Sequence, residues 1–122
     1  MRILKILVIF LIISISKYFG SANYAKYFVI LYPKCNCPNE NITMEMKNHQ
    51  MPKKFFEKKN GSCNDLHGLQ ACCVPSYSHK QQYVEITHTC GKEKIIRMYL
   101  YDQCEFINDI DNIYSYHCYE PR

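Results

Sequence analysis

The 122-residue sequence contains no tryptophan, only four glycines and only five prolines. So little glycine and proline excludes a collagen-like or linker-like composition. An excess of positive charge is also missing from most of the chain. Three of the 15 Lys and Arg residues precede residue 23, which leaves 12 basic against 11 acidic side chains in the remainder. Such a balance is not typical of a protein that binds nucleic acid.

The sequence also lacks the signatures of enzymes and metal sites. It has no serine nucleophile elbow, no phosphate-binding loop and no carboxylate pair in a recognisable setting; Asp109 and Asp111 lie in a polar segment. Zinc sites favour Cys-x-x-Cys or Cys/His pairs, whereas the spacings here are Cys-x-Cys and Cys-Cys. A catalytic cysteine is uncommon in secreted proteins, where cysteines are oxidised. We therefore expect no enzymatic activity, no cofactor and no metal site.

The N-terminus has the layout of a secretory signal peptide. Two basic residues precede an unbroken apolar run, Ile6–Ile13, and small residues follow at Gly20 and Ala22. Lys17 interrupts the apolar stretch before it reaches the roughly 20 residues that a membrane anchor needs. Residues 1–22 are therefore predicted to be a signal peptide. The mature protein is expected to be extracellular, with no segment inserted in the membrane.

All eight cysteines lie after this leader, in roughly 100 residues, and such a density is typical of a disulfide framework. Eight cysteines allow 105 connectivities, so the sequence alone does not pair them. The cysteines are Cys35, Cys37, Cys63, Cys72, Cys73, Cys90, Cys104 and Cys118.

Period-two alternation predicts a β-hairpin in the second half. Val84, Ile86 and His88 alternate with polar or aromatic residues, and 95–102 repeats the pattern after a polar turn at 91–94. Tyr27–Tyr32 is a short apolar run that we expect to pack on the core as a strand or a helix.

The remaining segments are predicted to be mostly irregular. The Asn-rich segment 39–50 is expected to be a surface loop with a glycosylation sequon at Asn41. Asn60-Gly61 is a turn signal, and it also begins a second sequon. The isoleucines of 107–113 give a weak helical periodicity. So many polar segments argue against a two-sheet sandwich with a large core.

The central segment resembles the platelet-derived and vascular endothelial growth factors. The residues that carry this resemblance are Gly61-Ser62-Cys63-Asn64-Asp65, Gly68-Leu69, Cys73-Val74-Pro75-Ser76, His79, Ile96-Arg97-Met98 and Asp102-Gln103-Cys104-Glu105. Cys72-Cys73, Cys90 and the strand after it also resemble the cystine-knot domains of norrin and mucins. Both resemblances imply a small, disulfide-rich, all-β fold of elongated antiparallel hairpins joined as a cystine knot.

Two positions depart from the growth-factor pattern, because Lys59 and Phe106 stand where the family has knot cysteines. The resemblance then implies an incomplete knot ring with a Cys63–Cys104 bond. It also implies that Cys73 bonds Cys37 (or Cys35), while Cys72, Cys90 and Cys118 have no assigned partner. The chain would divide into a signal peptide (1–22), an N-terminal segment with a polar loop (23–51), a growth-factor-like domain (52–106) and a tail tied by Cys118 (107–122).

The resemblance implies a secreted ligand that binds and dimerises a cell-surface receptor, such as a receptor tyrosine kinase. A homodimer, disulfide-linked in the family, would present two receptor sites. The expected contact residues are Phe55, Phe56, Tyr77, His79, Lys92, Lys94 and Arg97. Burial in a dimer is an equal alternative for the aromatic residues, and a solvated surface is the alternative for the lysines.

Two other readings stay open. The first is a diverged secreted protein, such as a venom, salivary or parasite effector, that binds or blocks a receptor without signalling. The second is a disulfide-rich protein of another class, such as a protease inhibitor or an antimicrobial peptide. The near-neutral charge of the mature chain argues against the antimicrobial peptide. The four lysines around Phe55 and Phe56 are interpreted as a solubilising flank in preference to a heparin-binding patch.

Overall fold

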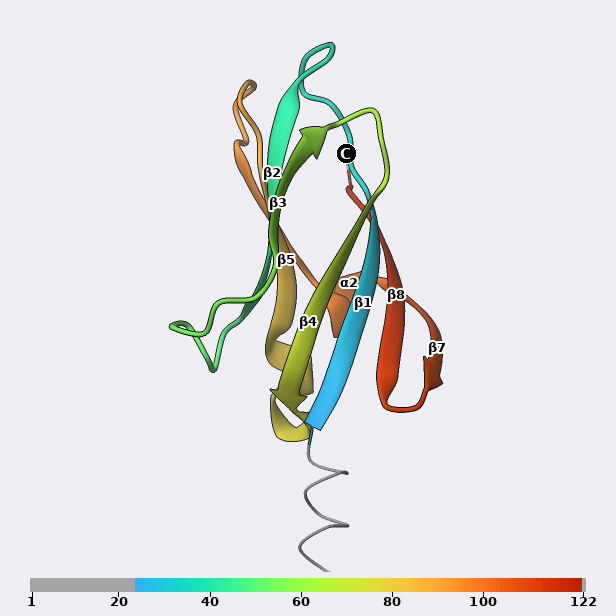
Figure 1. Ribbon diagram of the computed structural model, residues 1–122. Helices are drawn as coiled ribbons and strands as arrows, with labels where there is room; N and C mark the ends of the chain where they lie inside the picture. The colour runs from blue at the N-terminus through green and yellow to red at the C-terminus, as the bar shows by residue number, and fades with distance from the viewer. Residues whose placement is uncertain (1–23, 122) are drawn as a thin grey trace, which may run out of the picture.

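The computed structural model describes residues 24–121, apart from the side chains of Ser76 and Tyr77, so the predicted signal peptide lies outside the described residues. Within this range two four-stranded sheets face each other (Figure 1). The β1 sheet has the strand order β4-β1-β8-β7, and the β2 sheet has the order β3-β2-β5-β6. The elements are β1 (Tyr24–Tyr32), β2 (Asn41–Asn48), β3 (Lys58–Ser62), β4 (His67–Pro75), the 3-10 helix η1 (Ser76–Gln81), β5 (Gln82–Thr87), β6 (Ile95–Tyr99), the short helix α2 (Leu100–Gln103), β7 (Glu105–Ile110) and β8 (Ile113–Tyr119). No helix in this part of the chain is long and apolar enough to cross a bilayer.

The β1 sheet is mixed. Strand β1 pairs antiparallel with β4 and parallel with β8, which in turn pairs antiparallel with β7. Ala25, Tyr27, Val29 and Leu31 alternate along β1 and are buried, because every second side chain of a strand points to the same face. The apolar run predicted at 27–32 is thus a strand in the middle of this sheet.

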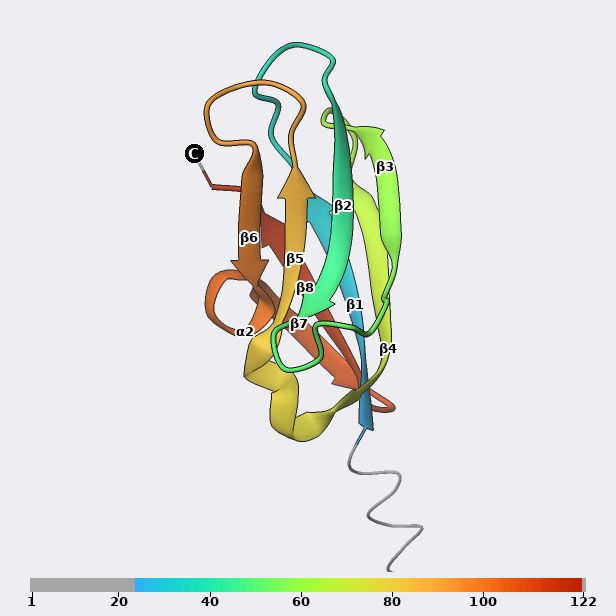
Figure 2. The ribbon, with the colours of Figure 1, turned by 90° about the vertical axis from the view of Figure 1, so that its left-hand side faces the viewer.

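The β2 sheet is antiparallel throughout, and its four strands lie side by side in Figure 2. The predicted hairpin is confirmed as β5 and β6, with Val84 opposite Met98 and Ile86 opposite Ile96. Ile42, Met44 and Met46 of β2 are also buried. These side chains belong to the same core cluster as those of β1, so the core lies between the two sheets.

The prediction of a small, disulfide-rich, all-β fold is confirmed, but the expectation against a two-sheet sandwich is wrong. Much of the segment predicted to be a polar loop, 39–50, forms β2, whose three buried apolar side chains alternate with polar ones. The weakly helical segment 107–113 contributes to strands β7 and β8. Asn60-Gly61 lies inside β3 instead of at a turn. A Cβ at Gly61 would lie 2.3 Å from Cε1 of His67, so a larger residue there would displace the His67 ring.

The disulfide pairs implied by the resemblance, Cys63–Cys104 and Cys37–Cys73, are not formed. The structure pairs Cys35 with Cys63, Cys37 with Cys90, Cys72 with Cys73 and Cys104 with Cys118. Cys63 follows β3, an edge strand of the β2 sheet, whereas Cys104 precedes β7, an edge strand of the β1 sheet. No two bonds join the same two segments, so these cysteines form no knot ring. Cys118 does tie the C-terminal segment, as expected.

A substitution in β2 tests whether this segment is a core strand. We expect Met44→Ala to lower the free energy of unfolding by about 2–5 kcal/mol, because it leaves a cavity between the sheets. The neighbouring Glu45→Ala, on the other face of the strand, serves as the control and should cost far less. Chemical denaturation of both oxidised variants measures the difference. Equal, small effects would contradict the placement of β2 in the core.

Candidate functional site

Three loops meet at one end of the sandwich. They are residues 33–40 between β1 and β2, residues 63–66 between β3 and β4, and residues 88–94 between β5 and β6. They lie together because β1, β3 and β5 all finish at this end, which is at the top of Figure 1. We call these three loops the disulfide-linked end.

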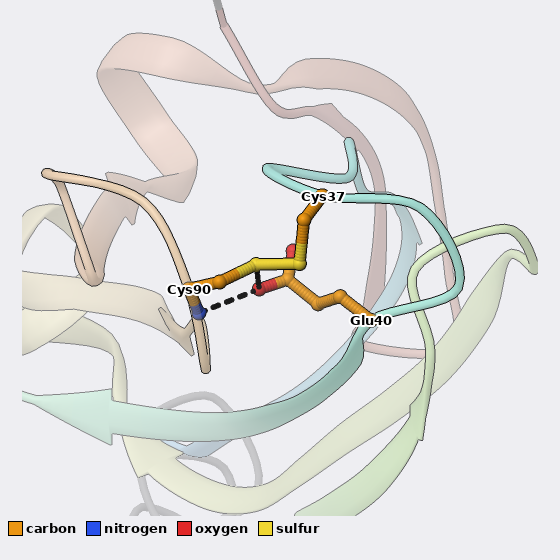
Figure 3. Close-up of side chains that lie close together, drawn as sticks. All are labelled: Cys37, Glu40 and Cys90. Atoms are coloured by element: carbon orange, nitrogen blue, oxygen red, sulfur yellow. Dashed lines mark hydrogen bonds between the residues drawn. A yellow bond between two sulfur atoms is a disulfide. The ribbon is translucent and has the colours of Figure 1, made fainter.

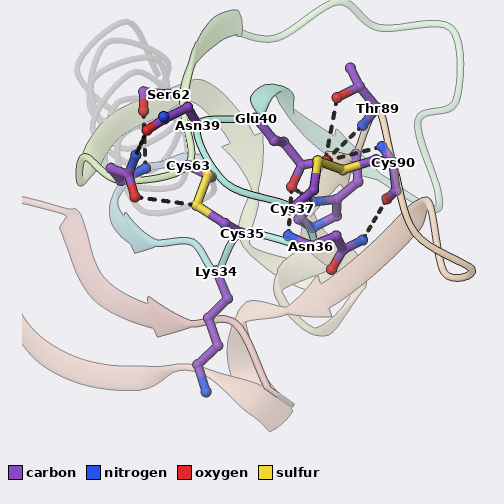
Figure 4. Close-up of a disulfide and its surroundings, with 12 residues drawn as sticks. Lys34, Cys35, Asn36, Cys37, Asn39, Glu40, Ser62, Cys63, Thr89 and Cys90 are labelled. Carbon is purple, nitrogen blue, oxygen red and sulfur yellow. Dashed lines mark hydrogen bonds and ion pairs between the residues drawn. A yellow bond between two sulfur atoms is a disulfide. The ribbon is translucent and has the colours of Figure 1, made fainter.

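Two disulfide bonds fix the first loop to the other two (Figure 4). Cys35 bonds Cys63 with a Cα–Cα distance of 5.1 Å, and Cys37 bonds Cys90 with a Cα–Cα distance of 6.4 Å. The bonded residues are 28 and 53 positions apart in the sequence. On the chain-entropy model each bond stabilises the folded state by about 4 kcal/mol. The loops are therefore held together by covalent bonds as well as by packing.

The carboxylate of Glu40 lies beneath the Cys37–Cys90 bond and is buried (Figure 3). It accepts hydrogen bonds from the backbone N–H groups of Asn36 (2.8 Å), Thr89 (3.0 Å) and Cys90 (3.2 Å). The ring Nδ1 of His88 donates a fourth, at 2.7 Å. A buried carboxylate is costly unless it is paired and hydrogen-bonded, and here both oxygens are satisfied.

His88 connects this carboxylate to a second one. Its Nε2 donates to the carboxylate of Glu120 at 2.9 Å, and Glu120 also accepts the backbone N–H of Lys34 at 3.2 Å. The side chain of His88 is 0% exposed. Because both ring nitrogens face carboxylates, both carry protons and the ring is an imidazolium. The Glu40–His88–Glu120 triad therefore joins the first loop, the third loop and the C-terminal segment.

Within the triad, the pKa values of Glu40 and His88 shift in opposite directions. Burial by itself raises the pKa of Glu40, but the four hydrogen-bond donors, led by the N–H of Asn36, outweigh burial and lower this pKa to about 2. Burial by itself lowers the pKa of His88, but the hydrogen bonds to Glu40 and Glu120 outweigh it and raise this pKa. Both groups are therefore charged at mildly acidic pH.

The side chain of Asn36 orders the turn between β5 and β6. Its Nδ2 donates to the backbone carbonyls of Cys90 (2.9 Å) and Glu93 (3.1 Å). Gly91 has a φ of +91°, and a Cβ there would lie 2.8 Å from Nδ2 of Asn36. Glycine is required at this position both for the backbone conformation and for the close approach of the amide.

Cys37, Glu40 and Cys90 lie close enough to resemble a metal site, with candidate ligand atoms within 4.8 Å of one another. The donor set does not fit a metal ion. The two sulfurs are bonded to each other, whereas zinc binds the thiolate. Glu40 is already satisfied by four donors. The group is a structural junction between two loops.

The predicted receptor-contact residues do not form one surface. Lys92 and Lys94 are exposed at the disulfide-linked end, and Arg97 lies on β6 with its Nε 3.0 Å from Glu85. The others lie on the segments at the opposite end: Phe55 is 76% exposed, Phe56 is buried, and His79 of η1 is half-buried. The side chain of Tyr77 lies outside the described residues.

His79 belongs to an aromatic cluster away from the disulfide-linked end. The hydroxyl of Tyr27 bonds its Nδ1, and the hydroxyl of Tyr116 lies 3.1 Å from its Nε2. Burial, with a smaller effect of the charge on Lys80, lowers the pKa of His79, and burial raises the pKa of Tyr116 to about 12. The ring of His79 is thus neutral at pH 7, and it packs against Tyr27 and Tyr116 of the β1 sheet.

The sequence interpretation missed Glu40, Glu120 and Asn36. One available signal was the alternation of Val84, Ile86 and His88, which continues from β5 into the loop and puts His88 on the same side as two buried residues. The predicted glycosylation residue, Asn41, is the first residue of β2 and its side chain is exposed.

The opposite pKa shifts predict a stability optimum in mildly acidic solution. The contribution of His88 is complete below pH 6.5 and is lost as the pH rises through the raised pKa of the folded state. That of Glu40 is complete above pH 4.5 and is lost as the pH falls towards 2. We expect His88→Gln to cost about 3–5 kcal/mol at pH 5.5, because it leaves two buried carboxylates unpaired, and clearly less at pH 9.

Denaturant unfolding of the oxidised protein between pH 3 and pH 9 measures this difference. His49→Gln, at an exposed histidine after β2, is the matched control and should follow the wild type at every pH. A cost of His88→Gln that is the same at pH 5.5 and pH 9 would contradict a charged His88.

Comparison of this chain with models of protein families, with curated proteins and with solved structures finds no match. The comparisons therefore add no relative from which an activity can be transferred. A function must be argued from the residues and geometry described above.

Proposed function

We propose that the protein is a secreted binding protein that recognises a cell-surface receptor through its disulfide-linked end. Secretion is supported by the leader-like segment 1–22 and by the pairing of all eight cysteines within the chain. Binding loops are commonly carried at one end of a rigid scaffold, and a two-sheet sandwich is such a scaffold.

The observation that carries this proposal is that disulfide bonds cross-link three loops whose outward side chains remain exposed. Two disulfide bonds and the hydrogen bonds to the buried carboxylate of Glu40 hold the backbone of these loops in place. Cross-linked loops lose little conformational entropy on binding, so more of the contact energy appears as affinity. The exposed residues are Lys34, Asn36, Pro38, Asn39, Asn64, Asp65, Leu66, Thr89, Gly91, Lys92, Glu93 and Lys94.

The chemistry of this end favours a protein partner. Amide groups and lysines surround Leu66, which is 61% exposed. A mixed polar rim around an exposed apolar side chain is typical of protein interfaces. His88, whose side chain is fully buried, is enclosed by the carboxylates of Glu40 and Glu120 and cannot reach a substrate. We therefore propose that the protein acts by binding and not by catalysis.

Receptor dimerisation, as the growth-factor resemblance implies, requires two such ends in one particle. We propose a homodimer formed through β7, an edge strand whose six side chains are all exposed. Phe106, Ile107 and Ile110 lie on it, and an exposed apolar edge strand readily pairs with another chain. Because every cysteine has a partner within the chain, this dimer would be non-covalent. Without a dimer, the protein would bind or block a receptor without clustering it.

Charge reversal at the tip of the third loop tests the recognition surface. We expect Lys92→Glu/Lys94→Glu to weaken saturable binding of the fluorescently labelled protein to cultured cells by at least about tenfold, as loss of a strong interface contact would. Lys53→Glu/Lys58→Glu changes the same charge away from the disulfide-linked end and should bind like the wild type. Equal binding by the two variants, or no saturable binding, would contradict the proposal.

The proposed dimer is tested by sedimentation equilibrium of the secreted protein at micromolar concentrations. We expect a dimer that Ile107→Lys/Ile110→Lys converts to a monomer, because charges on an edge strand oppose pairing. Ile95→Lys, on the edge strand β6 of the other sheet, is the control and should remain dimeric. A monomeric wild-type protein would contradict receptor dimerisation and would favour binding without signalling.

A further inference from the structure

The adjacent cysteines Cys72 and Cys73 form a β-bulge in β4. Ala25 of β1 pairs with Val74 and Tyr27 pairs with Ala71, so Lys26 alone faces both cysteines. Cys73 has a φ of +69°, in the left-handed region that residues other than glycine rarely adopt. Neighbouring side chains on a regular strand point to opposite faces, but a bulge re-aims them. The bulge therefore allows the two sulfurs to bond to each other.

This bond differs from the other three in what it does for the fold. The other bonds join residues 14, 28 and 53 positions apart and so restrict the unfolded chain strongly. A bond between neighbours closes no loop between elements. Cys72 and Cys73 are both exposed, whereas the remaining six cysteines are buried or half-buried. The Cys72–Cys73 bond is therefore accessible, and it restricts the unfolded chain less than the other three bonds do.

Cys72 borders a pocket of about 490 Å³ that is also lined by Lys26, Phe28 and Ile113, among others. Phe28 and Ile113 give this pocket an apolar wall. The ammonium group of Lys54 donates a hydrogen bond to the backbone carbonyl of Cys73 at 3.0 Å. Cationic groups near a cysteine favour the thiolate, which is both the nucleophile and the leaving group in disulfide exchange.

We propose that Cys72–Cys73 is a thiol–disulfide exchange site for small thiols with an apolar or aromatic group, which the pocket accommodates. The incoming thiolate attacks the sulfur of Cys72, and Cys73 leaves as a thiolate that then takes up a proton. A second thiol attacks the mixed disulfide and releases Cys72. Two thiols are oxidised to one disulfide, and the cysteine pair gains two electrons and two protons. A disulfide of the same class reverses the reaction.

Partial reduction of the folded, full-length secreted protein tests the site. The protein is treated with increasing concentrations of benzyl mercaptan or glutathione, trapped with N-ethylmaleimide and mapped by peptide mass spectrometry. We expect Cys72 and Cys73 to be alkylated at thiol concentrations at least about tenfold below those that open the other bonds, because exposed disulfides are the labile ones. Opening of all four bonds over the same range would overturn the proposal.

Two sets of variants separate the pocket from the bond. Cys72→Ser/Cys73→Ser should keep the circular dichroism spectrum of the wild type and lose the early alkylation. Phe28→Ala should slow exchange with benzyl mercaptan by at least about fivefold, the loss of one aromatic contact, and leave exchange with glutathione unchanged. Ile30→Ala, on the same face of β1 but not among the residues that line the pocket, is the control. Equal rates in the wild type and Phe28→Ala would overturn the role of the pocket.

Discussion

The buried carboxylate of Glu40 is the interaction on which the organisation of the disulfide-linked end depends. An ionised group out of water must be fully hydrogen-bonded, and its donors come from two loops that are about 50 residues apart in sequence. Neither loop contains regular secondary structure that would fix its conformation. The carboxylate gives both loops one position in which its charge is satisfied, and the Cys37–Cys90 bond then keeps them there.

The imidazolium of His88 extends this order to the end of the chain. It pairs with Glu120, one residue beyond β8, and β8 lies parallel to β1 in the middle of its sheet. A parallel pair needs a long connection, and here the connection is nearly the whole domain. The triad therefore joins the segment after β8 to the first loop and to the β5–β6 hairpin of the other sheet, across the end of the sandwich.

The sequence predicted the parts of the fold that local patterns determine. Val84 and Ile86 alternate with polar residues beside a glycine-containing turn, and β5 and β6 follow from that pattern. Strand β2 has the same alternation, but two of its three apolar residues are methionines, and they alternate with Asn, Thr, Glu and Lys. The segment was therefore predicted to be a polar loop. The parallel pairing of β1 with β8 has no local signal. Glu40 and Glu120 also have no local signal. An acidic residue in a polar segment is ordinarily exposed to solvent, so the sequence did not indicate that these two carboxylates are buried.

The cysteines show why a framework can be predicted without its connectivity. Their number and spacing indicated that they form disulfide bonds. Which sulfurs bond to each other depends on how the two sheets pack. The growth-factor resemblance implied the pairing of a cystine knot, which this fold does not have. The observed pairing divides the bonds into two kinds. Three bonds join separate segments of the chain, whereas Cys72 and Cys73 bond each other on an exposed bulge and join no separate segments. The left-handed backbone conformation of Cys73 and the adjoining apolar pocket are the two observations that set this pair apart, and the proposed exchange site rests on them.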